Sequence, residues 1–269
     1  MKKLILIALF CCSASIVFAQ DSKKQSSKEA RRAEKRERIS AMVKQEEEGV
    51  LAYYKQSAFG VQLRTNGYGV FYELGRMKTP RRTNLYSIEL TEIKHNKEER
   101  VQNTESFFAN SFVYGKVNNF YQFKLGYGKQ YIFGQKGNKN GIAVFGIFKA
   151  GLSGGLLKPY YLNVDDQASN MVIDIKYLDN KELFLDPSDG VINGSSGFSK
   201  GLSELSFNPG AYAKAALRFD FGRFNESIQA FEIGISADVY SKKVELMALN
   251  DPKQLFFQGH IAYIFGRRR

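Results

Sequence analysis

Residues able to carry out chemistry are scarce in this sequence. Its 269 residues include only two histidines, His95 and His260. Ser236 and Asp238 lie two positions apart in an alternating segment, so both side chains point to one face of a strand. If the strand that carries His260 lies beside them, the three residues form a Ser-His-Asp set typical of hydrolases. Serine is common on polar strand faces, and we therefore assign no catalytic residue.

The sequence also gives little support for thiol, metal or cofactor chemistry. The only two cysteines, Cys11 and Cys12, lie near the N-terminus. The acidic segment "DPSDG" (186–190) suggests calcium, but its spacing differs from that of an EF-hand loop. His95, within "IKHNKEER", is expected to be solvated. The sequence therefore predicts no metal site and no cofactor.

The N-terminus has the pattern of a secretory signal. "MKK" precedes the apolar run "LILIALFCCSASIVFA", and small residues lead up to a cut before Gln20. We predict a signal peptide at 1–19; a lipoprotein signal acylated at a cysteine within Leu9–Cys12 is the alternative. Beyond it no window of about 18 apolar residues follows, so only strands are available to cross a membrane.

A charged arm is predicted at 20–56. Within residues 22–38, eight lysines and arginines accompany three glutamates. The arm is interpreted as a partly helical flexible spacer or as a docking arm for anionic phosphates, cell wall or a partner protein. The cations assigned to such docking are Lys28, Arg31, Arg32, Lys35, Arg36 and Arg38. The formal net charge of +12 raises the question of nucleic acid, but no recognition motif accompanies it, so no nucleic-acid partner is predicted.

Strands dominate from residue 57 onward. "FEIGISADVY" (231–240) alternates apolar and polar residues with the period of a strand, and "TNGYG" (65–69) contains an Asn-Gly pair that favours a two-residue hairpin turn. The same reading gives eight strands, at 57–65, 68–77, 83–94, 119–133, 141–155, 209–221, 228–241 and 254–266.

Link lengths indicate a closed antiparallel meander. The second, fourth and sixth links are short, whereas the third, fifth and seventh are long, as in outer-membrane barrels. The longest link, 156–208, is interpreted as a solvated loop, a lid or a partner surface. Two segments within it, "MVIDIKY" (171–177) and "ELFLD" (182–186), are expected to extend as strands above the membrane.

The two faces of the strands differ in kind. One is rich in aromatic and aliphatic residues, and the other combines glycines with charges of both signs. A narrow eight-strand interior favours glycine, and enclosed charges must be compensated. We therefore place the polar face inside. The predicted interior network is Arg64, Glu73, Glu89, Lys124, Lys214, Arg218, Asp220, Glu232, Asp238 and His260.

Two points stay open at this stage. The strand at 141–152 is apolar on both faces, so the direction of Lys149 is undecided. A soluble lipocalin-like carrier would reverse the two faces and enclose the aromatic residues around a ligand.

Several stretches resemble a known family. "KPYYL" (158–162), "PGAYAKAALRFDFG" (209–222), "EIGISADVY" (232–240) and the closing "IFGRRR" are similar to stretches in small outer-membrane β-barrel proteins of Bacteroidota, an uncharacterised group. The resemblance covers roughly residues 57–269. It implies a β-barrel in the outer membrane, but it supplies no catalytic residues. From the alternation and the link lengths we expect eight transmembrane strands, with the arm and the C-terminus in the periplasm.

Three functions follow as hypotheses. The first is a non-enzymatic outer-membrane barrel in contact with lipid, structural or accessory to an envelope secretion or assembly complex. The second is a barrel-fold hydrolase or acyltransferase that modifies lipid A, and the third is the soluble carrier.

Overall fold

The main element of the structure, a computed structural model, is an eight-stranded antiparallel barrel. The residues that the structure describes are 31–34, 36–37, 53–101, 110–137, 141–166, 171–185, 190–223 and 226–269. The chain divides into two compact units, Met1–Val50 and Leu51–Arg269. In the first unit, residues 31–34 and 36–37 are helical, and Arg31, Arg32 and Arg36 are exposed. The predicted signal peptide and the arm residues Lys28, Lys35 and Arg38 lie outside the described residues.

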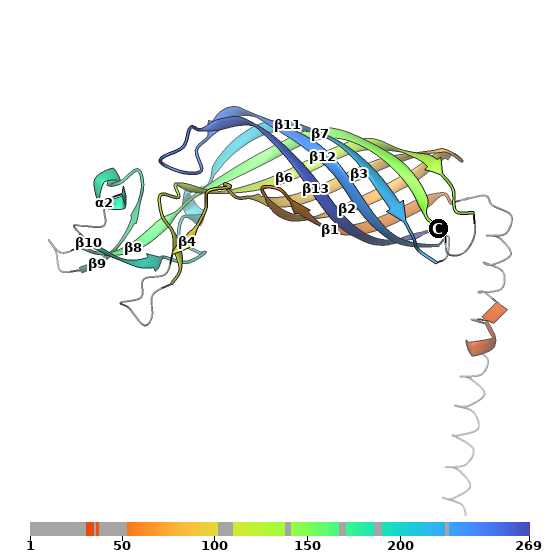
Figure 1. Ribbon diagram of the computed structural model, residues 1–269, viewed down its shortest axis with the longest axis horizontal. Helices are drawn as coiled ribbons and strands as arrows, with labels where there is room; N and C mark the ends of the chain where they lie inside the picture. The colour runs from red at the N-terminus through yellow and green to blue at the C-terminus, as the bar shows by residue number, and fades with distance from the viewer. Residues whose placement is uncertain are drawn as a thin grey trace, which may run out of the picture. The chain divides into compact units, whose positions relative to one another are not determined.

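The barrel closes because β1 pairs with both β2 and β13 (Figure 1). Its ring order is β1-β13-β12-β11-β7-β6-β3-β2, and all neighbours in the ring are antiparallel. The strands are β1 (Lys55–Arg64), β2 (Gly67–Thr79), β3 (Arg82–Ile93), β6 (Asn118–Gly134), β7 (Ala143–Pro159), β11 (Ser206–Asp220), β12 (Ser227–Val244) and β13 (Lys253–Arg268). The prediction of eight antiparallel strands is confirmed.

The observed strands differ from the predicted ones mainly at their ends. β7 continues to Pro159, four residues beyond the predicted end, because Leu156 and Leu157 still pair with Tyr121 and Phe120 of β6. The turn after β1 consists of Thr65 and Asn66, one position before the predicted Asn-Gly pair. Gly67 already belongs to β2 with φ of +152°, and a β-carbon there would lie 1.9 Å from the carbonyl oxygen of Glu92. Only glycine fits that position.

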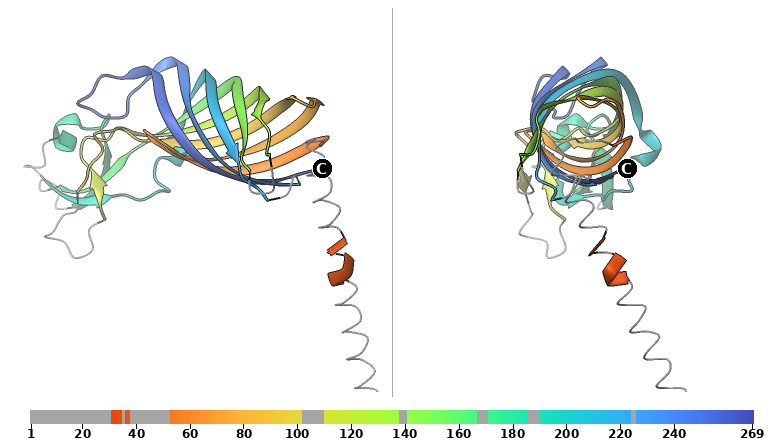
Figure 2. Two further views of the ribbon diagram at one scale, coloured as in Figure 1. Left: turned by 45° about the vertical axis from the view of Figure 1, so that its right-hand side comes forward. Right: turned by 90° about the vertical axis from the view of Figure 1, so that its right-hand side faces the viewer.

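Short and long links collect at opposite ends of the barrel. The end where Lys55 and Arg269 bond to each other carries the short links, and we call it the terminal end. The opposite end, the loop end, carries the turn after β1 and all three long links (Figures 1 and 2). This arrangement agrees with the predicted alternation, including the exceptional shortness of the first link.

The long link between β7 and β11 folds into a small sheet at the loop end, which we call the crown. β8 (Tyr161–Asp166) lies between β9 (Met171–Lys176) and β10 (Gly190–Ser195). The strand predicted at 171–177 is confirmed, but 182–186 is not a strand, because α2 occupies Lys181–Leu185. The interpretation as a solvated loop is also wrong. A buried apolar cluster joins the crown residues Leu162, Val164, Ile175, Phe184 and Ile192 to Phe112, which comes from the link between β3 and β6.

Shorter elements complete the loop end. β4 (Arg100–Val101) pairs with β5 (Phe112–Val113), and the 3-10 helix η2 (Leu202–Glu204) precedes β11. Among the residues that the structure describes, no helix has the length and apolar character needed to cross a membrane.

The barrel interior is tightly filled, so we predict that it does not accept a larger side chain at Gly60. A β-carbon there would lie 2.3 Å from the Phe71 ring. Gly60→Val is expected to lower the free energy of unfolding by about 1–3 kcal/mol through overpacking. Urea unfolding of the detergent-solubilised protein measures this change. Gly137→Ala is the control, since a β-carbon at Gly137 meets no atom within 4 Å; equal stabilities of the two variants would contradict the prediction.

Candidate functional site

The polar faces of the eight strands meet inside the barrel. The structure places all ten residues of the predicted interior network there, each no more than 8% exposed: Arg64, Glu73, Glu89, Lys124, Lys214, Arg218, Asp220, Glu232, Asp238 and His260. Each lies on the inward face because its strand alternates with period two. Their partners come from across the interior as well as from adjacent strands.

A central cluster joins three cations to three carboxylates. Arg218 binds Glu73 at 2.7 Å and Glu232 at 2.6 Å. Lys149 bridges Glu73 at 2.7 Å and Glu89 at 2.8 Å. Because Arg218 and Lys149 share Glu73, these side chains link β2, β3, β7, β11 and β12 into one network.

The remaining members of the central cluster surround Glu232. Lys214 binds Glu232 at 2.9 Å and lies 4.0 Å from Glu89. The Nε2 atom of His260 lies 3.2 Å from Glu232, whereas its buried Nδ1 has no partner among the described groups. The cations Lys149, Lys214 and Arg218 thus equal in number the carboxylates Glu73, Glu89 and Glu232. Buried charges of both signs are tolerated in such a paired arrangement.

A second cluster surrounds Asp238, nearer the loop end. Asp238 binds Arg64 at 3.0 Å and also contacts Lys124 and Gln258. Arg64 donates further hydrogen bonds to Thr91 and Gln122, both at 3.0 Å.

Asp220 forms a third cluster at the terminal end. It accepts a hydrogen bond from Arg268, lies 3.6 Å from Lys136, and accepts the backbone N–H of Gly222 at 2.9 Å. Arg268 also stacks over the ring of Tyr53 at 5.3 Å.

Several interior residues were missed in the sequence. Lys149 was left undecided because its strand is apolar on both faces, yet it is 3% exposed and central to the network. A carboxylate excess in the predicted interior was the available signal. Four predicted cations, Arg64, Lys124, Lys214 and Arg218, faced five carboxylates. Lys149 supplies a fifth buried cation, and Arg268, which contacts Asp220, supplies a sixth. Others that were missed include Gln130, Tyr212, Tyr240, Gln258 and Arg268.

Apolar clusters occupy the two ends of the interior. At the loop end, the rings of Phe120, Tyr240 and Phe256 pack at centroid distances of 5.1–6.0 Å. Toward the terminal end the cluster consists of Ala58, Phe71, Ile228, Ala230, Ala262 and Ile264. The central cluster and the Asp238 cluster therefore lie between two apolar clusters, whereas the Asp220 cluster lies at the terminal end itself.

The conceivable Ser-His-Asp set does not form. The Ser236 hydroxyl bonds to Gln258 at 2.9 Å, while the contact of His260 is with Glu232. Asp238 contacts cations and Gln258, and no hydrogen bond joins it to His260 among the described residues. A nucleophile, base and orienting carboxylate are therefore not brought together.

Metal binding and histidine chemistry receive no support from the loop end. Within the described ranges, no group of three potential metal ligands gathers, and the "DPSDG" segment lies outside them except for Gly190. Burial, together with the neighbouring Lys253, lowers the pKa of His95, so this residue is neutral at pH 7.

Two ion pairs lie on the surface of the crown. Lys176 donates to Glu204 at 2.6 Å and, with Tyr161, holds the pKa of that carboxyl below its ordinary value. Lys200 binds Asp174 at 2.7 Å and lowers the pKa of that carboxyl in the same way. Both carboxylates are therefore charged at neutral pH.

The outer wall of the barrel is apolar. Many large side chains are exposed on every strand, among them Leu63 at 68%, Leu152 at 71% and Phe257 at 69%. The lipocalin-like alternative required these residues to be enclosed, and the structure contradicts it: the aromatic and aliphatic face points outward and the charged face inward.

No protein-family model matches the chain, and no curated protein matches it either. Among solved structures, it is similar to Neisserial surface protein A, with 7% identity and a TM-score of 0.41, over 81% of this chain and 97% of that one. It is also similar to the N-terminal β-barrel domain of Pseudomonas aeruginosa OprF, with 11% identity and a TM-score of 0.36, over 80% and 99%. For Ail of Yersinia pestis the identity is 9% and the TM-score 0.33, over 81% and 99%.

The central cluster leads to a prediction about stability. Arg218→Met leaves Glu73 and Glu232 short of a cation and is expected to lower the free energy of unfolding by about 3–5 kcal/mol. Removing one carboxylate as well, in Arg218→Met/Glu232→Gln, is expected to restore part of the loss. Urea unfolding measures both changes, with Lys243→Met on the exposed surface as the control. A loss no greater than that of the control would contradict the role of the network.

Proposed function

We propose that this chain is a non-enzymatic β-barrel of the bacterial outer membrane that serves as a structural or accessory subunit of an envelope secretion or assembly complex. The observation that carries the membrane assignment is the exposed apolar wall. Soluble monomers rarely expose contiguous apolar patches larger than a few hundred Å². A lipid environment satisfies such a wall, and a closed barrel leaves no unpaired strand edge within the hydrocarbon.

A non-enzymatic role is supported by the pairing of charged side chains inside the barrel. The charged side chains of the central cluster are engaged with one another, and apolar clusters lie on both sides of them. Small-molecule sites are concave, largely apolar pockets with a few precisely placed polar groups. The interior network is therefore proposed to stabilise the barrel rather than to act on a substrate.

Orientation follows from the two ends. In outer-membrane barrels the short turns face the periplasm and the long loops face outward. By that rule the terminal end of this barrel faces the periplasm and the crown faces outward. The periplasmic side then holds the C-terminus and the basic arm, which is the proposed contact with a partner of the envelope.

Cysteine labelling tests membrane residence and orientation together. Beyond Cys11 and Cys12 the chain has no cysteine, so single-cysteine variants give a clear background once the predicted signal is removed. Leu178→Cys, at an exposed site of the crown, is expected to react with a membrane-impermeant maleimide in intact cells. Gly137→Cys, at the terminal end, is expected to react only after the outer membrane is permeabilised. Equal labelling of Gly137→Cys in intact cells, or recovery of the protein without detergent, would contradict the proposal.

Mild-detergent purification of the tagged full chain tests the subunit role. Recovery of envelope proteins in stoichiometric amounts supports it, whereas a chain that purifies alone contradicts it. Deleting residues 21–48 then tests the arm, with a charge-only variant as the matched comparison. In this variant glutamine replaces Lys28, Arg31, Arg32, Lys35, Arg36 and Arg38. Partners retained by both variants would exclude the arm as the docking element.

A further inference from the structure

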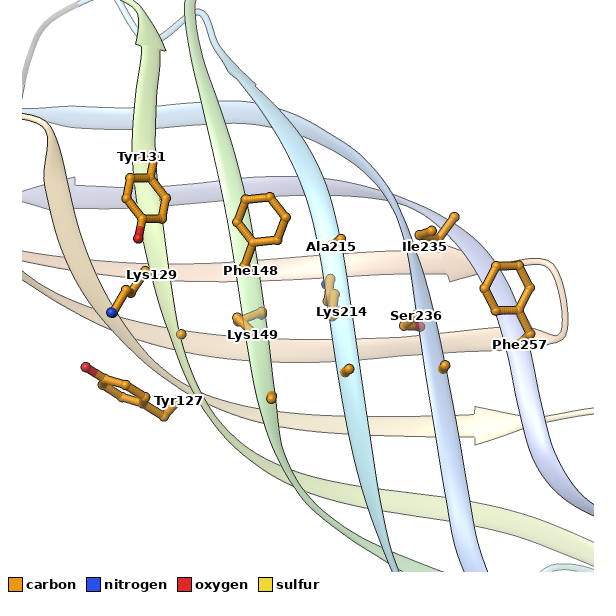
Figure 3. A pocket seen from close by; sticks show the side chains of 14 residues that line it. Tyr127, Lys129, Tyr131, Phe148, Lys149, Lys214, Ala215, Ile235, Ser236 and Phe257 are labelled. Atoms are coloured by element: carbon orange, nitrogen blue, oxygen red, sulfur yellow. The ribbon is translucent and has the colours of Figure 1, made fainter.

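One side of the outer wall is hollowed into a groove. The groove has a volume of 740 Å³ and extends across β6, β7, β11, β12 and β13 (Figure 3). Aromatic side chains border it, with Tyr127, Tyr131 and Phe148 on one side and Phe257 on the other. Elsewhere the wall carries large side chains in adjacent register, such as Phe231 beside Tyr263, whose rings lie 5.3 Å apart.

Strand register produces the hollow. Ala213 of β11 pairs with Ala150 of β7 on one side and with Ala237 of β12 on the other. Because the side chain of alanine is a single methyl group, three alanines in one cross-strand row leave the middle of the wall without large side chains. Ala215 on the same strand extends the hollow toward the terminal end. Lys149, Lys214 and Ser236 alternate with these residues and are buried on the opposite, interior face.

Two cations lie at the terminal-end side of the groove. Lys129 lines the groove and is exposed on β6, which runs toward the terminal end. The guanidinium of Arg82 stacks over the Tyr131 ring at 5.3 Å, and that ring packs against Phe148 at 6.4 Å. In the part of the chain that the structure describes, neither Lys129 nor Arg82 forms an ion pair with a carboxylate.

Carboxylates are scarce around these cations. Within the described ranges, Glu226 is the only side-chain carboxylate at the terminal end outside the barrel interior. Exposed cations are numerous at that end: Lys55, Arg76, Lys78, Arg81, Arg82, Lys129, Arg223, Arg267 and Arg269. The terminal end is therefore positive where the apolar wall meets the aqueous boundary, and an anion is the complementary partner.

We propose that the groove binds an anionic glycerophospholipid, with an acyl chain along the alanine row and the phosphate headgroup at Lys129 and Arg82. This inference rests on the proposed membrane function. The apolar groove alone distinguishes no lipid, because all lipid tails are equally apolar and only the fit of the packing differs. Selectivity comes from the cations, since lysine and arginine near a membrane surface attract anionic headgroups. The alanine row holds the chain of the selected lipid close to the wall.

A tryptophan reporter tests the proposal, because the protein contains no tryptophan. Phe148→Trp places the reporter at the border of the groove. The full chain is reconstituted into phosphatidylcholine vesicles that contain either brominated phosphatidylglycerol or brominated phosphatidylcholine, whose bromines quench nearby tryptophan. The expected preference for phosphatidylglycerol is about fivefold at low salt and falls at high salt.

Matched variants separate the contributions of charge and shape. In the reporter protein, Lys129→Gln/Arg82→Gln is expected to bring the preference for phosphatidylglycerol to about onefold. Ala213→Leu fills the groove with the charges intact and is expected to lower the same preference. Arg267→Gln removes a cation on β13, outside the groove lining, and is expected to leave the preference unchanged. Circular dichroism confirms that each variant is folded.

Three results would overturn the proposal. They are equal quenching by both lipids in the reporter protein, a preference that survives Lys129→Gln/Arg82→Gln, and a dimer in native mass spectrometry whose interface shields the reporter. The last result assigns the groove to a second copy of the chain. Each of these differs from failure of the membrane assignment, in which the protein does not enter the vesicles at all.

Discussion

The ion pairs of Arg218 with Glu73 and Glu232 are the interaction on which the rest of the barrel depends. All three side chains are at most 2% exposed, so each charge has been removed from water at a large free-energy cost. The ion pairs compensate this cost only if β2, β11 and β12 hold Glu73, Arg218 and Glu232 within hydrogen-bonding distance of one another. Charge pairing thus favours one closed arrangement of strands over arrangements that leave a carboxylate alone.

That constraint explains why the barrel is inverted relative to a soluble protein. With the interior filled by paired charges and small residues, the apolar side chains of each strand have only the outer wall to occupy. Glycine is needed where partners approach closely: a β-carbon at Gly126 would lie 2.0 Å from the Tyr212 hydroxyl. The exterior is then the apolar wall for which we propose a lipid environment. A polar interior and an apolar exterior are therefore two consequences of one period-two pattern.

The two ends of the barrel have separate characters. At the loop end, a cluster with Phe120, Tyr240 and Phe256 closes the interior, and the crown adds a second apolar cluster around Leu162 and Phe184. At the terminal end, short links carry exposed cations and few carboxylates. The proposed lipid site depends on this positive end, whereas the crown provides a folded surface at the loop end.

The sequence by itself determined the number of strands, the inward direction of the ten predicted interior side chains and the alternation of link lengths. These features are local, because a period of two and a turn signal can be read within ten residues. The ten predicted interior residues all lie on the inward face for this reason. Residues 182–186 show the limit of local patterns, since a short apolar run fits a strand or a helix and α2 forms there.

Only the tertiary structure decided which residues meet. Lys149 lies on a strand without clear alternation, and its place between Glu73 and Glu89 depends on the pairing of β7 with β6 and β11. The linear sequence likewise does not reveal the row of Ala150, Ala213 and Ala237, because the register of three paired strands brings these residues together. Register arises from the sum of pairing across the whole closed sheet, and for that physical reason no single segment of the sequence contains it.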